Sequence, residues 1–313
     1  MPKTTRLKRI AVLVSDIHLS HTPPIARTAE PDWYKAMARP LKQLRTIAGD
    51  TPVLIAGDIF DRWNAPAELI NFAIDQLPKN VIAIPGQHDL PNHNYALMRQ
   101  SAYGTLVKAD RITNLDPGKR VFLDTNTKQI FSITGFPWGT PLTQPLNTTR
   151  HEFSIALVHH YCWHGEHSYS GAPKSSNAVR LRKALRGFDL CVFGDNHKGF
   201  MLDLAAPEIL NCGALIRRTA DERTYSPVVS VLNSDGSVDR RHLDCKDDKF
   251  LAPDEEVPWE SVLQAMDTDL FLSRLKRLYN ETIDFAEAVR AVIKKEQLPQ
   301  AVAAVLEAAL EKK

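Results

Sequence analysis

The sequence predicts an α/β fold in which a largely parallel sheet is covered by helices on both faces. Short apolar runs rich in β-branched residues alternate with segments of helical periodicity in the first part of the chain, and this order is typical of parallel sheets. The 313 residues are 43% hydrophobic and 24% charged, which is the composition of a globular protein with a sizeable core. This length allows one large domain and an appendage.

The first strands and helices follow each other in a regular order. Helical patterns, with apolar residues on one face, cover Trp33–Ile47 and Pro66–Leu77. The short β-branched runs that flank them predict strands at Ile10–Val14, Val53–Ala56 and Val81–Ile84. Because a helix connects each pair of successive strands, these strands should be parallel neighbours in one sheet.

The later strands lack such regular helical connections. They are predicted at Ile130–Thr134, Ile155–Val158, Leu190–Phe193, Ile209–Cys212 and Val228–Leu232. Asp235 and Gly236 stand between the last of these and a further run, Val238–Leu243, which indicates a hairpin turn. We therefore expect the later part of the chain to be more antiparallel.

The composition changes near Phe250, where a stretch rich in proline and acidic residues begins. We predict a main domain over 1–248, a linker over 249–258 and a helical appendage over 259–313. Apolar residues at helical spacing give two of the appendage helices an apolar face. Such a face must be buried, either against the main domain or against a partner.

Charge and cysteine content narrow the class of protein only slightly. The formal net charge of +2 argues neither for nor against a polyanionic partner, so a nucleic-acid site would have to come from local patches. The four cysteines form no CxxC pair and are expected to be isolated thiols in a reducing compartment. No apolar run approaches the roughly 20 residues of a membrane span, so we expect a cytoplasmic protein without a membrane partner.

Five short polar clusters each follow a predicted strand. They are Asp16-Ile17-His18, Gly57-Asp58-Ile59-Phe60-Asp61, Gly86-Gln87-His88-Asp89, His159-His160 and Gly194-Asp195-Asn196-His197. Because the carboxyl ends of parallel strands share one edge of a sheet, the loops that carry these clusters should converge. Each cluster alone is a weak signal, but the whole ordered set is hard to obtain by chance.

The side chains in these clusters suit divalent metal ions. Carboxylate, imidazole and amide ligands favour Mn, Fe, Zn or Mg over thiolate-bound metals. A carboxylate such as Asp58 can bridge two ions, and two ions about 3.5–4 Å apart can activate a water and neutralise a phosphate. The sequence therefore predicts a dinuclear hydrolase of phosphate esters.

The ordered motifs resemble the calcineurin-like metallophosphoesterase superfamily over about residues 10–245. The resemblance rests on DxH, GDxxD, an element like GNHD, a histidine after a strand, and a closing GxxH. It implies a four-layer fold of two packed mixed β-sheets flanked by helices, with metals at the sheet edge. The stretches GDIFDRWN, GQHDLPNHN and NCGALIRR, with a long helix after the third motif, look like the DNA-repair nuclease branch. That branch contains SbcD-type subunits and phage relatives.

The resemblance also implies a role for each motif residue. His88 would contact the scissile phosphate and assist the leaving group, and Asp89 would orient His88 by hydrogen bonding. Two divalent ions are implied, with Mn2+ favoured and Mg2+, Fe2+ or Zn2+ open. The ligands of the first would be Asp16, His18, Asp58 and His197, and those of the second Asp58, Gln87, His159 and Asp195.

Two of these positions depart from the family's pattern. Gln87 stands where asparagine is usual, and it offers the same amide oxygen on a longer arm. Asp195 replaces the first histidine of the usual GHxH motif, and its added negative charge should favour Mn or Mg over Zn. His159 is the expected ligand after its strand, whereas His160 would lie outside the metal ligands.

The substrate is less well defined than the reaction. Basic and aromatic residues near the motifs, among them Arg180, Arg218 and Trp63, suit a nucleic-acid groove, although the basic run 180–186 also fits a solvated helix face. We expect a DNA nuclease. The alternatives are a phosphatase or small-molecule phosphodiesterase, and a non-catalytic scaffold subunit. The implied partners are DNA and, through the C-terminal helices, the coiled coil of an ATPase subunit, and a homodimer stays open.

Overall fold

A computed structural model describes residues 7–123, 128–145, 149–168, 172–203 and 206–252, together with Arg290, Ala304 and Glu307. The chain divides into two compact units. The first is formed by Met1–His21 and Glu30–Asp248, and the second by Thr22–Ala29 and Lys249–Lys313. Apart from the three single residues just named, the predicted helical appendage lies outside the described residues.

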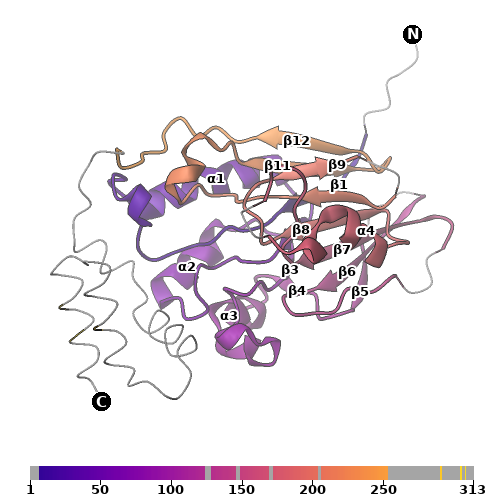
Figure 1. Ribbon diagram of the computed structural model, residues 1–313, viewed down its shortest axis with the longest axis horizontal. Coiled ribbons are helices and arrows are strands. Elements are labelled where there is room, and N and C mark those ends of the chain that lie inside the picture. The colour runs from indigo at the N-terminus through magenta and orange to yellow at the C-terminus, as the bar shows by residue number, and fades with distance from the viewer. Residues whose placement is uncertain are drawn as a thin grey trace, which may run out of the picture. The chain divides into compact units, whose positions relative to one another are not determined.

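One sheet of the first unit has six strands in the order β12-β11-β1-β2-β3-β4 (Figure 1). Strands β1 to β4 are parallel, while β11 and β12 form an antiparallel hairpin beside β1. The bounds are β1 Arg9–Val14, β2 Val53–Ala56, β3 Val81–Ile84, β4 Thr113–Asn114, β11 Val228–Asn233 and β12 Val238–His242. The three strands predicted first in the sequence are therefore confirmed, as is the hairpin at Asp235 and Gly236.

The second sheet also has six strands, in the order β5-β6-β7-β8-β10-β9. Its four inner strands are parallel, and antiparallel pairing occurs only at the edge strands β5 and β9. The expectation of a more antiparallel later part is therefore confirmed at the two edges of this sheet and wrong for its four inner strands. The bounds are β5 Arg120–Leu123, β6 Ile130–Phe136, β7 Glu152–His159, β8 Leu190–Gly194, β9 Phe200–Leu202 and β10 Glu208–Asn211.

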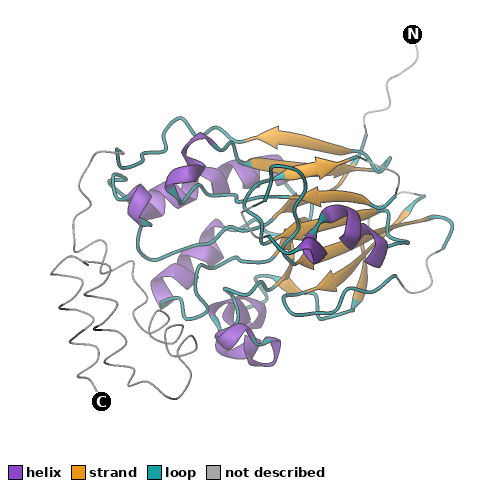
Figure 2. Ribbon diagram, in the orientation of Figure 1, coloured by secondary structure: helices purple, strands orange, loops and turns teal. Residues whose placement is uncertain are grey.

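The helices of the described chain lie outside the two sheets (Figure 2). They are α1 Trp33–Ala48, α2 Ala67–Gln76, α3 Ala102–Lys108 and α4 Ala178–Ala184. Helix α1 begins after Asp32, whose carboxylate accepts a hydrogen bond from Lys35 N, and it ends at Gly49, which has a φ of 56°. Short 3-10 helices cover Ile25–Arg27, Pro91–His93, Tyr95–Gln100, Lys174–Ser176 and Ala220–Thr224.

The third motif is not followed by the long helix that was expected. Instead, two 3-10 helices lead into α3, which has seven residues. Pro91 and Asn92 explain the difference. Proline disfavours a helical backbone conformation at the preceding residue, Leu90, and Asn92 adopts a left-handed conformation with a φ of 51°. One of the features on which the resemblance to the nuclease branch rests is therefore absent.

Three apolar clusters define the layers of the fold. Alternate residues of β1 face opposite sides, since Ala11 and Leu13 lie in the cluster between the sheets and Val12 and Val14 lie under α1. A third cluster joins the outer face of the second sheet to Leu181 and Leu185, in and just after α4. The order is helices, sheet, sheet, helix, as the four-layer prediction requires.

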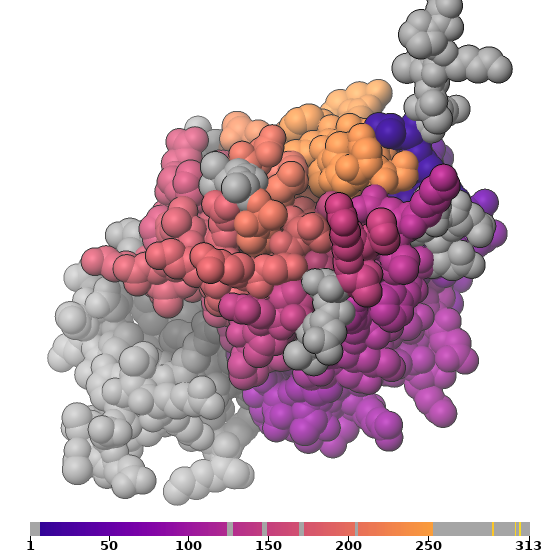
Figure 3. Space-filling view, turned by 90° about the vertical axis from the view of Figure 1, so that its right-hand side faces the viewer, coloured from indigo at the N-terminus to yellow at the C-terminus, as the bar shows by residue number. Residues whose placement is uncertain are grey.

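The start of the described chain lies beside the β11–β12 hairpin, far away in the sequence. Figure 3 shows the two segments side by side, and Ser234 N donates a hydrogen bond of 2.8 Å to Lys8 O. Three of the four free cysteines, Cys162, Cys191 and Cys212, are buried. No helix in the described part of the chain is both long and apolar enough to cross a membrane.

Candidate metal centre

Five strands from both sheets deliver the polar motifs to one edge of the fold. The loops after β1, β2 and β3 carry the first three motifs, His159 is the last residue of β7, and Asp195 directly follows β8. Backbone hydrogen bonds join these loops, from Asp16 N to Gly57 O at 3.1 Å and from His18 N to Asp58 O at 3.0 Å. The predicted convergence of the motifs is what the structure shows.

Four of the motif residues have a backbone conformation that side chains rarely adopt. The φ angles are 49° at Asp16, 49° at His18, 53° at Asp58 and 80° at Asp195. The left-handed region costs a residue with a side chain about 1–2 kcal/mol. Such strain persists when surrounding structure enforces it, and it is concentrated at functional sites.

Glycines make room for the imidazole of His159. A Cβ atom on Gly57 would lie 2.0 Å from Nδ1 of His159, and one on Gly86 would lie 2.6 Å from its Nε2. Gly57 also has a φ of 93°, which favours glycine on its own account. The glycines of the second and third motifs thus have a steric function that their position in the sequence did not specify.

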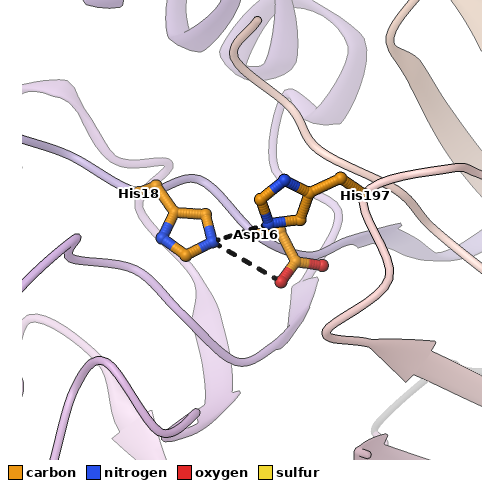
Figure 4. Close-up of side chains that lie close together, drawn as sticks. All are labelled: Asp16, His18 and His197. Atoms are coloured by element: carbon orange, nitrogen blue, oxygen red, sulfur yellow. Dashed lines mark hydrogen bonds and ion pairs between the residues drawn. The ribbon is translucent and has the colours of Figure 1, made fainter. Parts of the chain in front are cut away.

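Asp16, His18 and His197 form the first group of candidate ligands (Figure 4). Nε2 of His18 lies 3.1 Å from Nε2 of His197 and 3.8 Å from Oδ1 of Asp16. Nδ1 of His197 is 3.1 Å from Oε1 of Glu222. A carboxylate oxygen only accepts, so Nδ1 of His197 donates and its Nε2 faces the cluster.

Asp58 and His159 form the core of the second group, together with Asp16. Nδ1 of His159 donates to Ala56 O at 2.6 Å, because a carbonyl can only accept. Nε2 of His159 therefore faces the cluster, 3.3 Å from Oδ2 of Asp58 and 2.7 Å from Oε1 of Gln87. The amide nitrogen of Gln87 donates to Oδ1 of Asp195 at 2.6 Å, which fixes the orientation of the amide.

These donor sets fit divalent cations. Oδ2 of Asp58 is buried and has no hydrogen-bond donor among the described residues, although it lies 3.7 Å from Nε2 of His18 and 3.3 Å from Nε2 of His159. The Nε2 atoms of two histidines thus face one carboxylate oxygen from different sides without forming a hydrogen bond to it. Such an arrangement requires a bound cation or bound protons, and carboxylates and imidazoles are common ligands of divalent metals.

The charges of this cluster are strongly coupled. Burial, partly offset by His159 and His197, raises the pKa of Asp16 to about 6. For Asp58, burial opposes ionisation, but His159 and His88 outweigh it, so its pKa is lowered. Burial lowers the pKa of His18 well below its usual range, and the nearby Arg218 adds to the effect. The site therefore holds Asp58 ionised and His18 neutral, which are the forms that bind metal.

His88 lies at the exposed side of the same cluster. It can form a ligand group with His18 and Asp58, and its backbone N donates to Oδ1 of Asp58 at 3.0 Å. Its Nδ1 lies 2.9 Å from Asp61 O and must donate, which leaves Nε2 for a phosphate or a metal. The geometry thus suits the predicted contact with phosphate and also allows ligation.

Asp89 does not have the orienting role that was expected. Its buried carboxylate accepts hydrogen bonds from the backbone N of Phe60 at 2.9 Å, Gly86 at 3.1 Å and Ile59 at 3.2 Å. Asp89 thus holds the second and third motif loops together, while Asp61 O holds the ring of His88. Burial and the charge of Asp58 raise the pKa of Asp89 to about 7, even though the three N–H groups oppose that rise.

Two residues at the site were not identified as site residues from the sequence. Glu222 orients His197, and its other oxygen accepts from Arg218 N and Thr219 N. The signal for Glu222 is a capping box, Thr219-Ala220-Asp221-Glu222. Asp61 lies 3.8 Å from Nδ1 of His18 and pairs with Arg218 at 2.7 Å.

The structure brings together every residue predicted to bind metal. Six side chains fall in groups whose ligand atoms lie within 4.8 Å of one another, namely Asp16, His18, Asp58, His88, His159 and His197. Gln87 and Asp195 adjoin them through the hydrogen bonds described above. Of the two adjacent histidines, His159 lies in the cluster, while half-buried His160 has a pKa lowered by burial.

A search of solved structures finds matches of low sequence identity. An archaeal phosphodiesterase is 13% identical with a TM-score of 0.38, and the match covers 74% of this chain and 99% of that chain. The calcineurin-like phosphoesterase YfkN from Bacillus subtilis is 13% identical with a TM-score of 0.41, and the match covers 86% of this chain and 99% of that chain. A dimetal phosphatase from Danio rerio is 10% identical with a TM-score of 0.43, and the match covers 75% of this chain and 98% of that chain.

The family itself is identified by a match to the sequence. A search of curated proteins finds no significant relative. Residues 10–199, more than half of the chain, match the family described as Calcineurin-like phosphoesterase. The matched range includes every residue that was predicted to bind metal, from Asp16 to His197. The chain belongs to the calcineurin-like phosphoesterase family.

Proposed function

We propose that this protein is a DNA nuclease that hydrolyses phosphodiester bonds with two divalent metal ions, preferably Mn2+. Its family and its candidate dinuclear site support metal-dependent hydrolysis of phosphate esters. The observation that carries this coarser activity is the buried Oδ2 of Asp58, which lies between His18 and His159 and accepts no hydrogen bond from the residues that the structure describes. The choice of a diester, of DNA and of manganese rests on further features.

The protein residues around this oxygen have separate tasks. Two bound divalent ions would neutralise the phosphate and activate a water for attack. Asp58 would supply negative charge to both ions, while Glu222 and Ala56 O fix the tautomers of His197 and His159. Asp195 adds a carboxylate on the side of His159, and its hard oxygen donor favours Mn2+ over Zn2+.

His88 and Arg218 would act on the phosphate itself. His88 is exposed, and its Nδ1 is held by Asp61 O, so Nε2 can contact a non-bridging or leaving oxygen. The guanidinium of Arg218 lies at the other side of Asp61 and pairs with its carboxylate at 2.7 Å. Its positive charge beside His18 can attract a polyanionic substrate to the site.

The surface of α4 favours a nucleic acid over a small phosphate ester. The helix connects β7 to β8, the two strands that deliver His159 and Asp195. Arg180, Lys183 and Arg186 on and just after α4 are exposed, and within the described chain none of them forms an ion pair with an acidic side chain. Arg180 and Lys183 are three residues apart on one side of the helix, and Arg186 follows just after its end. A row of cations of this kind neutralises successive phosphates of a strand.

The test is a panel of substrates with the full chain and Mn2+. Single-stranded DNA, double-stranded DNA, an aryl phosphodiester and an aryl phosphomonoester are compared for kcat/KM. We expect DNA to be cleaved with the highest kcat/KM. Preference for the monoester would instead identify a phosphatase, preference for the aryl diester a small-molecule phosphodiesterase, and no turnover of any substrate a scaffold protein.

A triple variant tests the row of cations directly. Replacing Arg180, Lys183 and Arg186 with serine should raise KM for DNA and reduce the salt dependence of binding by about one unit of slope per cation. The matched control replaces the exposed Lys42, Lys79 and Lys108, which removes the same charge elsewhere. An equal effect of the two triple variants would argue against a DNA path along α4.

A partner is proposed for residues 259–313, on the basis of the sequence alone. Their apolar helical faces would bind the coiled coil of an ATPase subunit. Truncation after Phe250 should abolish capture of such a partner and retain hydrolysis of a small diester. Insoluble or inactive truncated protein would instead assign the helices to the catalytic fold.

A further inference from the structure

Trp138 lies beside the metal centre, although no motif contains it. It follows β6 at the edge where the ligand loops converge, because Phe136 of β6 pairs in register with Val158 of β7. Its backbone N donates to Pro85 O at 3.2 Å, directly before the third motif. The side chain of Trp138 is only partly buried, so a large aromatic ring is present at the rim of the site.

Trp138 connects a metal-ligand residue to the surface through ring contacts. Its ring centroid lies 6.3 Å from that of His159, at an interplanar angle of 63°, and 6.3 Å from that of His93, at 81°. Both contacts are edge-to-face. The three rings thus lead from buried His159 through partly buried Trp138 to exposed His93.

The loop that carries His93 is strained and fixed. Asn92 and His93 have φ angles of 51° and 56°, and two successive left-handed residues with side chains are costly. Hydrogen bonds hold the turn, from His93 N to Leu90 O at 3.1 Å and from Asn94 N to Pro91 O at 3.0 Å. Leu90 and Pro91 are buried, whereas His93 is exposed. The strain thus serves to present the imidazole next to Trp138.

We propose that Trp138 and His93 form a subsite for the nucleobase next to the scissile phosphate. This inference rests on the proposed nuclease function. It names the part of the substrate that would be recognised beside His159, in the second group of candidate ligands. Aromatic side chains stack on nucleobases of any sequence, because every base has a π face. The subsite would hold one base of a single strand and thereby position the adjacent phosphate between His88 and the ligands of His159's group.

The experiment compares two strands with equal charge. One is oligothymidylate, and the other has the same length with base-free tetrahydrofuran residues. The wild-type protein with Mn2+ should have a KM about 5- to 100-fold lower for oligothymidylate, the range expected for stacking of one base. The ratio of KM for the base-free strand to KM for oligothymidylate should fall toward one in Trp138→Ala and in His93→Ala. Trp138→Phe should retain most of this ratio.

The control is Phe122→Ala, which removes an exposed ring on β5 that is paired with Ser132, away from the ligand edge. This variant should keep the wild-type ratio. An unchanged ratio in Trp138→Ala would overturn the subsite, and so would a loss of bound Mn2+ in both Trp138 variants, since the ring would then only support His159. Equal KM values for both strands in the wild type would overturn the subsite but leave the nuclease proposal standing. Cleavage of neither strand would overturn both.

Discussion

Nε2 of His159 lies 3.3 Å from Oδ2 of Asp58, and both side chains are buried. Nδ1 of the same ring donates to Ala56 O, so any proton on Nε2 makes the ring an imidazolium. Burial opposes that charge, but Asp58 outweighs it, together with Asp16 and Asp195, and the pKa of His159 rises to about 10. In the metal-free protein a proton thus occupies the lone pair that would bind the metal.

Metal binding should therefore release protons. Below about pH 10 the metal-free His159 is protonated, and it must become neutral to bind a metal, so apparent affinity should rise with pH from about 7 to 9. The pKa of His197 is also raised, since Glu222 and Asp16 outweigh the effect of burial. Calorimetric titration with Mn2+ in buffers of different ionisation enthalpy should report about one or two protons per chain. Zero protons at pH 8 would contradict the assignment of His159.

Glu222 should be required for tight binding at the first group. Glu222→Gln keeps the shape of the side chain but removes the charge that holds Nδ1 of His197 at 3.1 Å. Metal affinity or activity should fall about 10- to 100-fold, as for other residues that orient a metal-bound histidine. The control is Asp221→Asn, an exposed acid in the same short helix. Equal effects of the two substitutions would show that only the general charge matters.

The sequence predicted the strands and the converging motifs better than their connections. Val53–Ala56 and Val81–Ile84 have the predicted bounds, because buried parallel strands appear as continuous apolar runs. The direction of β10 was missed. Strand β10 runs parallel to β8 and pairs with it directly. Strand β9 lies between β8 and β10 in the sequence, but it pairs with β10 at the outer edge of the sheet. No local sequence pattern indicates this strand order.

The motif residues were found, but the roles of their neighbours were not. Asp89 follows His88 directly, yet its side chain turns inward to three backbone N–H groups. Glu222 is 25 residues from His197, so only the folded chain connects them. Motif spacing therefore identifies the candidate ligands at strand ends. The carboxylates that support these ligands are brought to them only by the tertiary structure and cannot be found from motif spacing.

Gly57 should be needed for the position of His159. Gly57→Ala would place a Cβ atom 2.0 Å from Nδ1 of His159 at a φ of 93°, so the ring must move and metal binding should be lost. Gly118→Ala is the matched control, because Gly118 has a φ of 70° with nothing within 4 Å of the added Cβ. Both variants should lose about 1–2 kcal/mol of stability from the left-handed backbone. Thermal unfolding with and without Mn2+ distinguishes the two variants, because Mn2+ should stabilise only Gly118→Ala. Equal stabilisation of both variants by Mn2+ would refute the steric role of Gly57.

His88 should act in turnover more than in metal binding. His88→Ala removes the exposed imidazole that Asp61 O orients, and kcat should fall about 100- to 10,000-fold if His88 protonates the leaving group. Metal content, measured by elemental analysis after gel filtration, should stay at the wild-type level. A loss of metal would show that His88 acts through the ligand group it can form with His18 and Asp58.

Electron paramagnetic resonance of the Mn2+-loaded protein tests most directly whether Asp58 holds two metal ions together. Two Mn2+ ions that share a bridging carboxylate couple to each other, so wild-type protein should bind two ions per chain and give the spectrum of a coupled pair. Asp58→Asn, with circular dichroism as a check of folding, should lose the coupling and at least one ion. A single, uncoupled Mn2+ in the wild type, or an unchanged coupled pair in folded Asp58→Asn, would contradict the dinuclear centre.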